Sequence, residues 1–310
     1  MPAYSPIALF VYKRPDHTRR TLDALMQCPE FSESPLHVFC DGAKRLEDQA
    51  AVEQTRSVVW SLVGDRAKIV EAPRNQGLAN SIIAGVNQTV DQYGQVIVLE
   101  DDLVVSPIFL TYMNSALEKY RHENQVMQIS GYMFPVPEFA SRDDAMFLPF
   151  TVSWGWATWQ RAWQYFDSEA TGWQVLREDR QLRKRFNLNG AYDHFSMMER
   201  QFHGECDSWA IRWYWSVFRC NGLVLFPAQT LVENYGFDGS GTHGSWTRRY
   251  RPDYLGKQPS FYLPNEIDID KASFRLVYRN LQKISFSTLL KFPKACLEFF
   301  KSTRSNEFQT

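Results

Sequence analysis

The chain has 310 residues, and its 34 Lys and Arg side chains are balanced by 35 Asp and Glu side chains. This length provides material for a sizeable core in one large domain or two smaller ones, and the charge balance removes any general electrostatic case for nucleic-acid binding. The five cysteines are scattered and odd in number, no secretory pattern opens the chain, and no apolar run approaches the ~20 residues of a membrane-spanning helix. We therefore expect a cytoplasmic protein.

The first 130 residues alternate between predicted strands and predicted helices. Short apolar runs predict strands at Ile7–Tyr12, Leu36–Cys40, Lys68–Glu71 and Val126–Ser130. Helices are expected after the first strand (with Leu22, Leu25 and Met26 on one face), over residues 47–63, from Leu78, and from Ser106-Pro107 to about Tyr120. This order predicts an α/β fold with a mostly parallel, twisted sheet and helices on both faces.

A further strand, expected at residues 96–102, ends in three consecutive carboxylates: Glu100, Asp101 and Asp102. Its apolar part does not alternate with polar residues, which is typical of a strand buried on both faces. Ligands of open α/β sheets bind at the carboxyl ends of such strands, and adjacent acids repel one another unless a cation or hydrogen bonds compensate them. Oxygen ligands favour Mg²⁺ or Mn²⁺. The segment predicts a metal-assisted enzyme with a phosphate leaving group; a helix N-cap or a solvated strand end is the alternative.

The alternation of a strand divides these three acids. Glu100 and Asp102 share one face and Asp101 points the other way, so all three could bind one ion only if the strand bends. We expect Asp102 to bind the metal, Asp101 to face a ribose hydroxyl or the backbone, and Glu100 to support them.

After Pro135 the sequence pattern changes to short predicted strands, aromatic clusters and Gly-rich loops. A charged stretch predicts helix over about Trp173–Phe202, an apolar run predicts a strand at Leu223–Phe226, and four glycines predict a flexible loop over Asn234–Gly244. No linker separates the parts. We expect residues 1–135 and 136–265 to be two halves that share one core, followed by a tail over residues 266–310.

The tail is basic and aromatic from about Lys271 to Arg304, with eight Lys and Arg against one Glu. This composition is compatible with a peripheral membrane contact through residues 271–304. A tail helix that packs on the body and keeps a solvated basic face is the equally acceptable alternative.

Four segments carry a resemblance to a known family: Tyr12–Asp23, Phe39-Cys-Asp-Gly42, Val98-Leu-Glu-Asp-Asp-Leu103 and Cys206-Asp-Ser-Trp209. Together they resemble the GT-A glycosyltransferases, most of all the inverting N-acetylglucosaminyltransferase I type and its bacterial relatives, over roughly residues 5–250. The resemblance implies that Arg14 contacts the nucleotide and Asp41 the uracil. It also implies that Asp102, the last acid of a Glu-Asp-Asp version of the DxD motif, holds Mn²⁺, and that Asp207 is the catalytic base.

Two shorter matches extend the resemblance. Ser153-Trp-Gly-Trp156 resembles the loop near the transferred sugar, which implies roles for Gly155 and Trp156. Gly241-Thr-His-Gly244 resembles a mobile loop that closes over the donor diphosphate, which implies roles for Thr242 and His243, with His243 also a candidate metal ligand; an incidental surface His is the alternative. The base motif departs from the family in having Cys206 and Ser208 where a Trp and a second acid stand. The Golgi enzymes also carry a membrane anchor and stem, which we do not find here.

By this resemblance we expect an inverting, divalent-metal-dependent glycosyltransferase with a nucleotide-sugar-binding first half and an acceptor-binding, catalytic second half. The donor is expected to be a UDP-sugar, with UDP-N-acetylglucosamine the first candidate, and the acceptor a glycan or lipid-linked oligosaccharide of bacterial surface-polysaccharide synthesis. A metal neutralises the leaving diphosphate, and a carboxylate such as Asp207 deprotonates the acceptor hydroxyl. A local cap or an ion pair with Arg212 is the alternative role of Asp207.

Other readings stay open. A nucleotidyltransferase shares the sheet and the acids, but usually has a Gly-rich phosphate loop where this chain has Lys13-Arg14-Pro15. A non-catalytic carbohydrate-binding protein on the same fold is the other alternative. Arg74 and Asn75 precede a predicted helix and are candidate nucleotide contacts. Aromatic side chains that could form an acceptor platform, at least half of which we expect in the core, are Trp154, Trp156, Trp159, Trp209 and Trp213.

Overall fold

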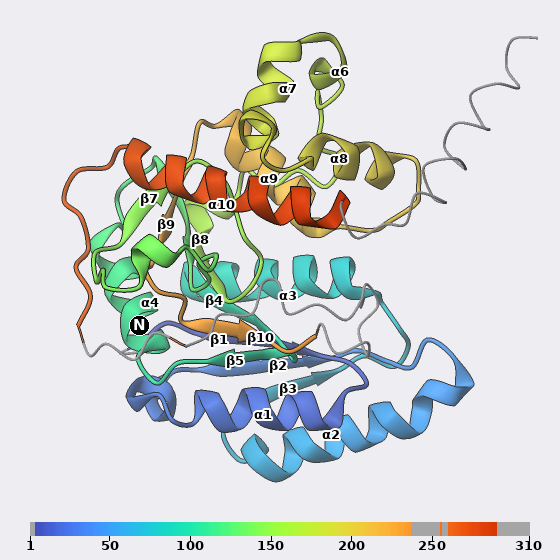
Figure 1. Ribbon diagram of the computed structural model, residues 1–310. Helices are drawn as coiled ribbons and strands as arrows, with labels where there is room; N and C mark the ends of the chain where they lie inside the picture. The colour runs from blue at the N-terminus through green and yellow to red at the C-terminus, as the bar shows by residue number, and fades with distance from the viewer. Residues whose placement is uncertain (1–3, 237–254, 256–259, 290–310) are drawn as a thin grey trace, which may run out of the picture.

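The computed structural model describes residues 4–236, 255 and 260–289 (Figure 1). The strands are β1 (Ile7–Val11), β2 (Leu36–Cys40), β3 (Ala67–Glu71), β4 (Gln95–Glu100), β5 (Leu103–Val105), β6 (Val126–Ser130), β7 (Met146–Leu148), β8 (Trp156–Trp159), β9 (Leu223–Phe226) and β10 (Val232–Asn234). The α-helices are α1 (Pro15–Leu25), α2 (Gln49–Val63), α3 (Leu78–Tyr93), α4 (Phe109–Lys119), α5 (Gln160–Trp163), α6 (Val175–Glu178), α7 (Arg180–Phe186), α8 (His194–Phe202), α9 (Trp209–Arg219) and α10 (Lys271–Leu289).

The central sheet has the strand order β3-β2-β1-β4-β8-β6-β9-β7. Strands β1 to β4 are parallel to one another, with Leu9 opposite Val38 of β2 and Leu99 of β4. β8 is antiparallel to both β4 and β6, β6 is parallel to β9, and β7 is antiparallel to β9. The predicted α/β class with a mostly parallel sheet is therefore confirmed, and β10 pairs with β5 in a separate antiparallel ribbon.

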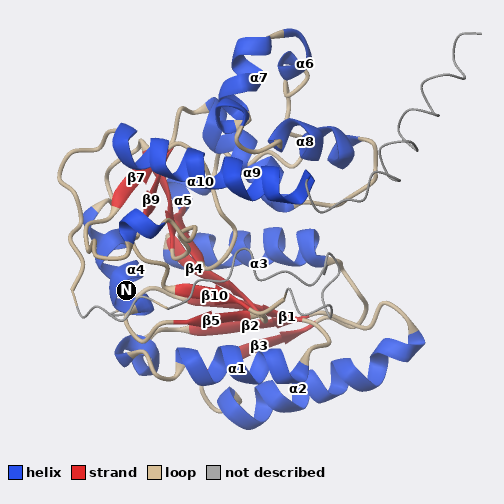
Figure 2. Ribbon diagram, viewed as in Figure 1, coloured by secondary structure: helices blue, strands red, loops and turns tan. Residues whose placement is uncertain are grey.

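Helices cover both faces of this sheet (Figures 1 and 2). Residues alternate along β1: Ile7, Leu9 and Val11 join the cluster under α1, α2 and α4, whereas Ala8 and Phe10 join the cluster under α3 and α9. Successive strand side chains point to opposite faces. A strand buried on both sides must therefore be apolar throughout, which explains the uninterrupted apolar runs of the sequence.

The second half of the chain builds one side of the same sheet. β8 lies between β4 and β6, and the Trp156 side chain on β8 is fully buried. Its indole stacks on Trp209 of α9 with ring centroids 5.1 Å apart. The aromatic clusters after Pro135 therefore serve mainly as core: Trp156, Trp159, Trp209 and Trp213 are 4% exposed or less, and Trp154 is half-buried.

Three predicted elements differ from the structure. The charged stretch Trp173–Phe202 forms three short helices, α6, α7 and α8, because Asp179 and Asp193 each accept backbone N–H bonds at a new helix start. The helix expected from Ser106-Pro107 begins at Phe109 after a turn. The acid-tipped strand ends at Glu100, and the chain turns at Asp101–Asp102 before β5. In the described part of the chain, no helix combines the length and apolar character needed to cross a membrane.

Candidate active site

The carboxyl ends of the parallel strands β1, β2 and β4 meet at one edge of the sheet, which we call the carboxylate edge: Tyr12, Arg14, Asp41 and residues 100–102. The turn at Asp101–Asp102 corrects the prediction that strand alternation governs these acids. Beyond Glu100 the backbone is not extended, so the geometry that separates neighbouring strand side chains no longer applies.

Asp101 is the buried anchor of this edge, with 5% of its side chain exposed. It forms an ion pair with the Arg14 guanidinium and accepts a bond from the Tyr12 backbone N–H at 3.3 Å. Thr21 of α1 donates to the Asp101 carbonyl oxygen at 2.8 Å. Asp101 therefore joins β1, α1 and the end of β4, and its carboxylate is directed into the protein.

Asp102 is more accessible, with 14% of its side chain exposed, and its Oδ2 lies 3.0 Å from Arg14 Nη2. The Tyr235 N–H donates to the Asp102 carbonyl oxygen at 2.8 Å. A Cβ placed on Gly236 would lie 2.1 Å from Asp102 Oδ2. The segment after β10 therefore passes directly over the candidate metal ligand, and the space there admits only glycine.

The three acids carry more negative charge than Arg14 can balance. Burial, followed by the nearby Asp102 and Asp101 carboxylates, raises the pKa of Glu100 above its ordinary value. A divalent cation beside Asp102 would relieve this repulsion, so the donor set fits a hard metal ion. Within the described residues, no group of three or more His, Cys, Asp and Glu side chains is arranged to hold a metal by itself. A cation here would need most of its ligands from substrate or water.

Asp41, 8% exposed, organises the loop before α3. Its carboxylate accepts bonds from the backbone N–H groups of Gly42, Gln76 and Gly77 at 2.8–3.1 Å, and from Asn75 Nδ2 at 2.9 Å. The turn packs so closely that a Cβ on Gly42 would lie 2.5 Å from the Arg74 carbonyl carbon. The structure thus brings Asp41 and Asn75 together as a rigid loop.

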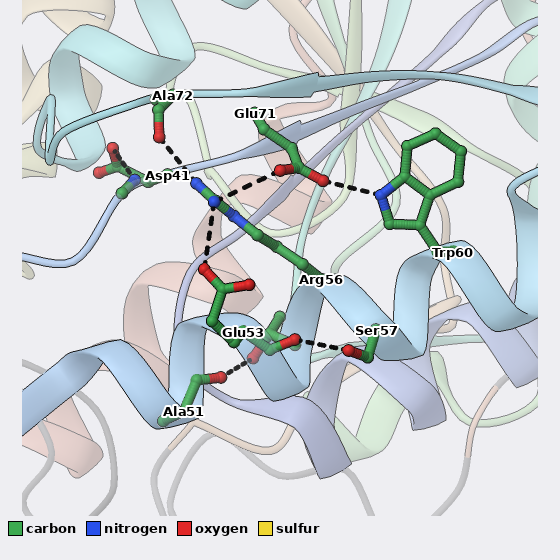
Figure 3. Close-up of polar contacts among 10 residues, drawn as sticks. Asp41, Ala51, Glu53, Arg56, Ser57, Trp60, Glu71 and Ala72 are labelled. Atoms are coloured by element: carbon green, nitrogen blue, oxygen red, sulfur yellow. Dashed lines mark hydrogen bonds and ion pairs between the residues drawn. The ribbon is translucent and has the colours of Figure 1, made fainter.

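The loop is also fixed from the side of α2, as Figure 3 shows. Arg56 donates to the Ala72 carbonyl oxygen at 2.7 Å and pairs with Glu71 at 3.3 Å. Trp60 Nε1 donates to Glu71 Oε1 at 2.7 Å. The end of β3 is therefore tied to α2. Arg74 itself is exposed, and its backbone packs against Gly42, the residue after Asp41.

A second network at this edge was not predicted from the sequence. Asp48, 5% exposed, accepts bonds from Lys13 Nζ at 2.6 Å and from the Tyr12 hydroxyl at 3.1 Å. The Lys13 hydrogen bond is the main reason that the pKa of Asp48 falls to about 2. The Lys44 N–H donates to the Tyr12 hydroxyl at 3.0 Å, so this network fixes the Tyr12 ring beside the edge. The Tyr12-Lys13 pair beside Arg14 was the available signal, but Asp48 lies 35 residues away.

Asp207 lies in the loop two residues before α9. Its side chain is 58% exposed and its Oδ1 accepts a bond from Arg212 Nη2 at 2.8 Å. Arg212, only 10% exposed, also donates to the Ser208 carbonyl oxygen at 3.2 Å, and the Ser208 hydroxyl caps α9. The ion pair with Arg212 that the sequence offered as an alternative is present, and the exposed carboxylate still faces solvent.

The remaining predicted residues divide into two groups. Gly155 and Trp156 are buried. A Cβ on Gly155 would lie 2.7 Å from Val232, and the Trp156 indole packs against Trp209 in the core. Thr242 and His243 lie outside the described residues.

Comparison with known proteins gives one family match. Residues 11–206 match the family described as Glycosyl transferase family 2. No curated protein sequence matches.

Solved structures similar to this chain include a mannosyltransferase from Pyrobaculum calidifontis in complex with GDP-Man and Mn²⁺. It is 16% identical, with a TM-score of 0.34, over 53% of this chain and 48% of that one. A glucosyl-3-phosphoglycerate synthase from Mycobacterium tuberculosis in complex with Mn²⁺, UDP and glucosyl-3-phosphoglycerate is 13% identical, with a TM-score of 0.33, over 53% and 58%. The chain thus spans about half the length of the structures it matches.

Proposed function

The chain belongs to glycosyl transferase family 2, and we propose that it transfers a sugar from a nucleotide-sugar donor, with a divalent metal, to a glycan or lipid-linked acceptor. Its membership agrees with the predicted α/β GT-A fold and with the prediction of a glycosyltransferase. The N-acetylglucosaminyltransferase I type, the UDP-sugar donor and a role in bacterial surface-polysaccharide synthesis remain parts of the proposal.

The carboxylate edge carries this proposal, because it gathers three acids and one arginine at the carboxyl ends of β1 and β4. We assign Asp102 to the metal and Arg14, Asp101 and Glu100 to the support of that ligand. A bound Mn²⁺ or Mg²⁺ would neutralise the charge that develops on the leaving diphosphate. The Asp41–Asn75 loop and the exposed Arg74 would line the nucleotide. Roles for Gly155, Thr242 and His243 toward the sugar and phosphates remain parts of the proposal, whereas the fully buried Trp156 indole packs in the core.

Asp207 is our candidate for the base. An exposed carboxylate just before α9 can accept the proton of an acceptor hydroxyl, and the hydrogen bond from Arg212 orients it. With Asp207 as the single candidate base, we propose that the reaction inverts the anomeric centre. NMR assignment of the product anomer tests this: a retained configuration would exclude a single displacement.

The first experiment is a thermal-shift series with UDP, GDP, UDP-N-acetylglucosamine and GDP-Man, each with Mn²⁺ and with EDTA. A ligand that binds only the folded state raises Tm by mass action. At a ligand concentration of one hundred times Kd, the free energy of unfolding rises by roughly 2.7 kcal/mol. We expect a shift with UDP or one UDP-sugar that requires Mn²⁺ and disappears in Asp102→Asn. The matched control is Asp65→Asn, which removes an exposed acid far from the edge.

Product analysis separates the alternatives. Release of UDP with an acceptor supports transfer, whereas formation of a nucleotide sugar and pyrophosphate from a sugar phosphate would identify a nucleotidyltransferase. Donor binding without turnover across acceptors would identify a carbohydrate-binding protein. A metal-independent shift that survives Asp102→Asn would contradict the metal assignment.

A further inference from the structure

The helix α10 is anchored to the body along one face. Ser273, Val277 and Leu281, spaced four residues apart, are 0–3% exposed. The Asn280 amide donates to the Pro135 carbonyl oxygen at 2.9 Å, and the Arg142 guanidinium donates to Ser273 Oγ at 2.8 Å. Figure 1 shows α10 lying across the upper part of the molecule beside β7 and α9. The helix therefore presents its opposite face in a fixed orientation.

That opposite face carries a regular row of cations. Lys271, Arg275, Arg279 and Lys283 are all exposed and are spaced four residues apart, so they form one stripe along the helix, about 18 Å long at 1.5 Å per residue. Residues 271–289 contain no Asp or Glu. We call this row the α10 stripe.

The α10 stripe does not stabilise the described part of the protein. Like charges four residues apart destabilise a helix, and among the described residues no ion pair joins the four side chains to an acid, the nearby Asp270 being paired with Arg142. The whole chain has a net charge close to −1, so the stripe is a local concentration of charge and not part of a generally basic surface. An arrangement that costs helix stability suits an external anionic partner.

We propose that the α10 stripe rests on a membrane surface that contains anionic lipids. The apolar face of α10 packs on the body, so the attraction is electrostatic: a row of exposed cations is drawn to the negative surface potential of anionic lipids. Each Lys or Arg near such a surface strengthens binding roughly fivefold, and the attraction decays within a Debye length of about 8 Å. The four cations follow one ridge of the helix that turns by about 40° at each step, and their long, flexible side chains can meet the same surface. This inference goes beyond the proposed transfer reaction.

The test is sedimentation of the full chain with phosphatidylcholine vesicles, with and without roughly one third phosphatidylglycerol, in the absence of nucleotide and metal. We expect binding to the anionic vesicles that weakens steeply as salt rises. The variant K271Q/R275Q/R279Q/K283Q should lose at least ~100-fold in partition. The charge-matched variant R19Q/K68Q/R180Q/K184Q removes four exposed cations elsewhere and should stay within about threefold of wild type.

The control variant should keep the wild-type Tm, because the replaced side chains are exposed, and the stripe variant should equal or slightly exceed it, because it removes like-charge pairs four residues apart. Equal binding to neutral vesicles, no binding to either, or an equal loss in both variants would overturn the proposal. Wild-type binding of the K271Q/R275Q/R279Q/K283Q variant to anionic vesicles would also overturn the proposal. Vesicle binding is measured without a nucleotide sugar, so a negative result would leave the proposed transfer reaction unaffected. In the same way, the absence of a thermal shift with donor would leave the membrane proposal for the α10 stripe unaffected.

Discussion

Asp101 and Asp207 are each paired with an arginine, but the side chain of Asp101 is 5% exposed and that of Asp207 is 58% exposed. Asp101 also accepts a backbone N–H bond and lies between β1 and β4, whereas Asp207 makes its ion pair at the open start of a helix. Breaking a buried pair leaves an uncompensated charge, whereas an exposed pair contributes little to stability. The first region is suited to holding charge in place, and the second to exchanging a proton with a substrate.

The largest expected effect is on the rate of transfer in Asp207→Asn. The amide can still accept the Arg212 bond but cannot take a proton, so kcat should fall about 10³-fold, within the usual range for a general base. Stability should change by less than ~0.5 kcal/mol, and the donor-induced thermal shift should persist. The control is Glu205→Gln, an exposed acid two residues earlier. Near-normal transfer in Asp207→Asn would require another base, with Glu205 the first to examine.

The next effect is on the stability of the carboxylate edge in Arg14→Gln. This change leaves Asp101 without its cation, and the free energy of unfolding should fall by about 3 kcal/mol in urea titrations. Mn²⁺ should then stabilise the variant more than it stabilises wild type, because the ion replaces part of the missing charge. A loss below ~0.5 kcal/mol would mean that Asp101 does not depend on Arg14. Arg14→Lys should recover part of the loss.

The smallest effect concerns the pH dependence of the aromatic region behind Asp207. His194 lies 4.5 Å from the Tyr214 ring centroid, and its Nδ1 is 3.2 Å from the Phe186 carbonyl oxygen. Burial lowers the pKa of His194 to about 4, from an unfolded value of about 6.5. Between these values the unfolded chain binds more protons, so this contribution is present above pH 6.5 and is lost as the pH falls toward 4.

The variant His194→Phe measures this contribution. Its free energy of unfolding should vary less than that of wild type between pH 6.5 and 4, by roughly 1–2 kcal/mol because the ring is partly exposed. Above pH 7 the two proteins should differ by a constant amount. Parallel profiles across the acid range would show that His194 is not held neutral by the fold.

The two regions also differ in how far they could be predicted from the sequence. The bounds of the apolar strands β1, β2, β4 and β6 were predicted within a residue or two. A strand buried on both faces consists of a nearly continuous run of apolar residues, which can be recognised in the sequence. The position of Glu100, Asp101 and Asp102 at the carboxyl end of β4 was predicted for the same reason. The turn at Asp101–Asp102 was not, since it depends on contacts with Arg14 and with Tyr235, distant in sequence.

In the second half, the signals were present but weaker. Asp179 and Asp193 each begin a new helix, and Asn189 at φ 57° and Gly190 at φ 92° help to end the segment between them. Capping acids inside a charged stretch look like surface residues until their N–H partners are known. The Tyr12–Lys13–Asp48 network joins residues 35 and 36 positions apart, and no local pattern reveals such a pair.

The position of β8 in the sheet has a consequence for synthesis of the chain. β4 keeps an unpaired edge over Gln95–Val98 until residues 156–159 emerge and pair with it. During translation, the nascent first half therefore exposes apolar strand edge of the kind that pairs with other chains. A fragment that stops at residue 135 should aggregate, and extension through β9 should reduce aggregation, because β8 then fills the edge of β4 and β9 fills the outer edge of β6.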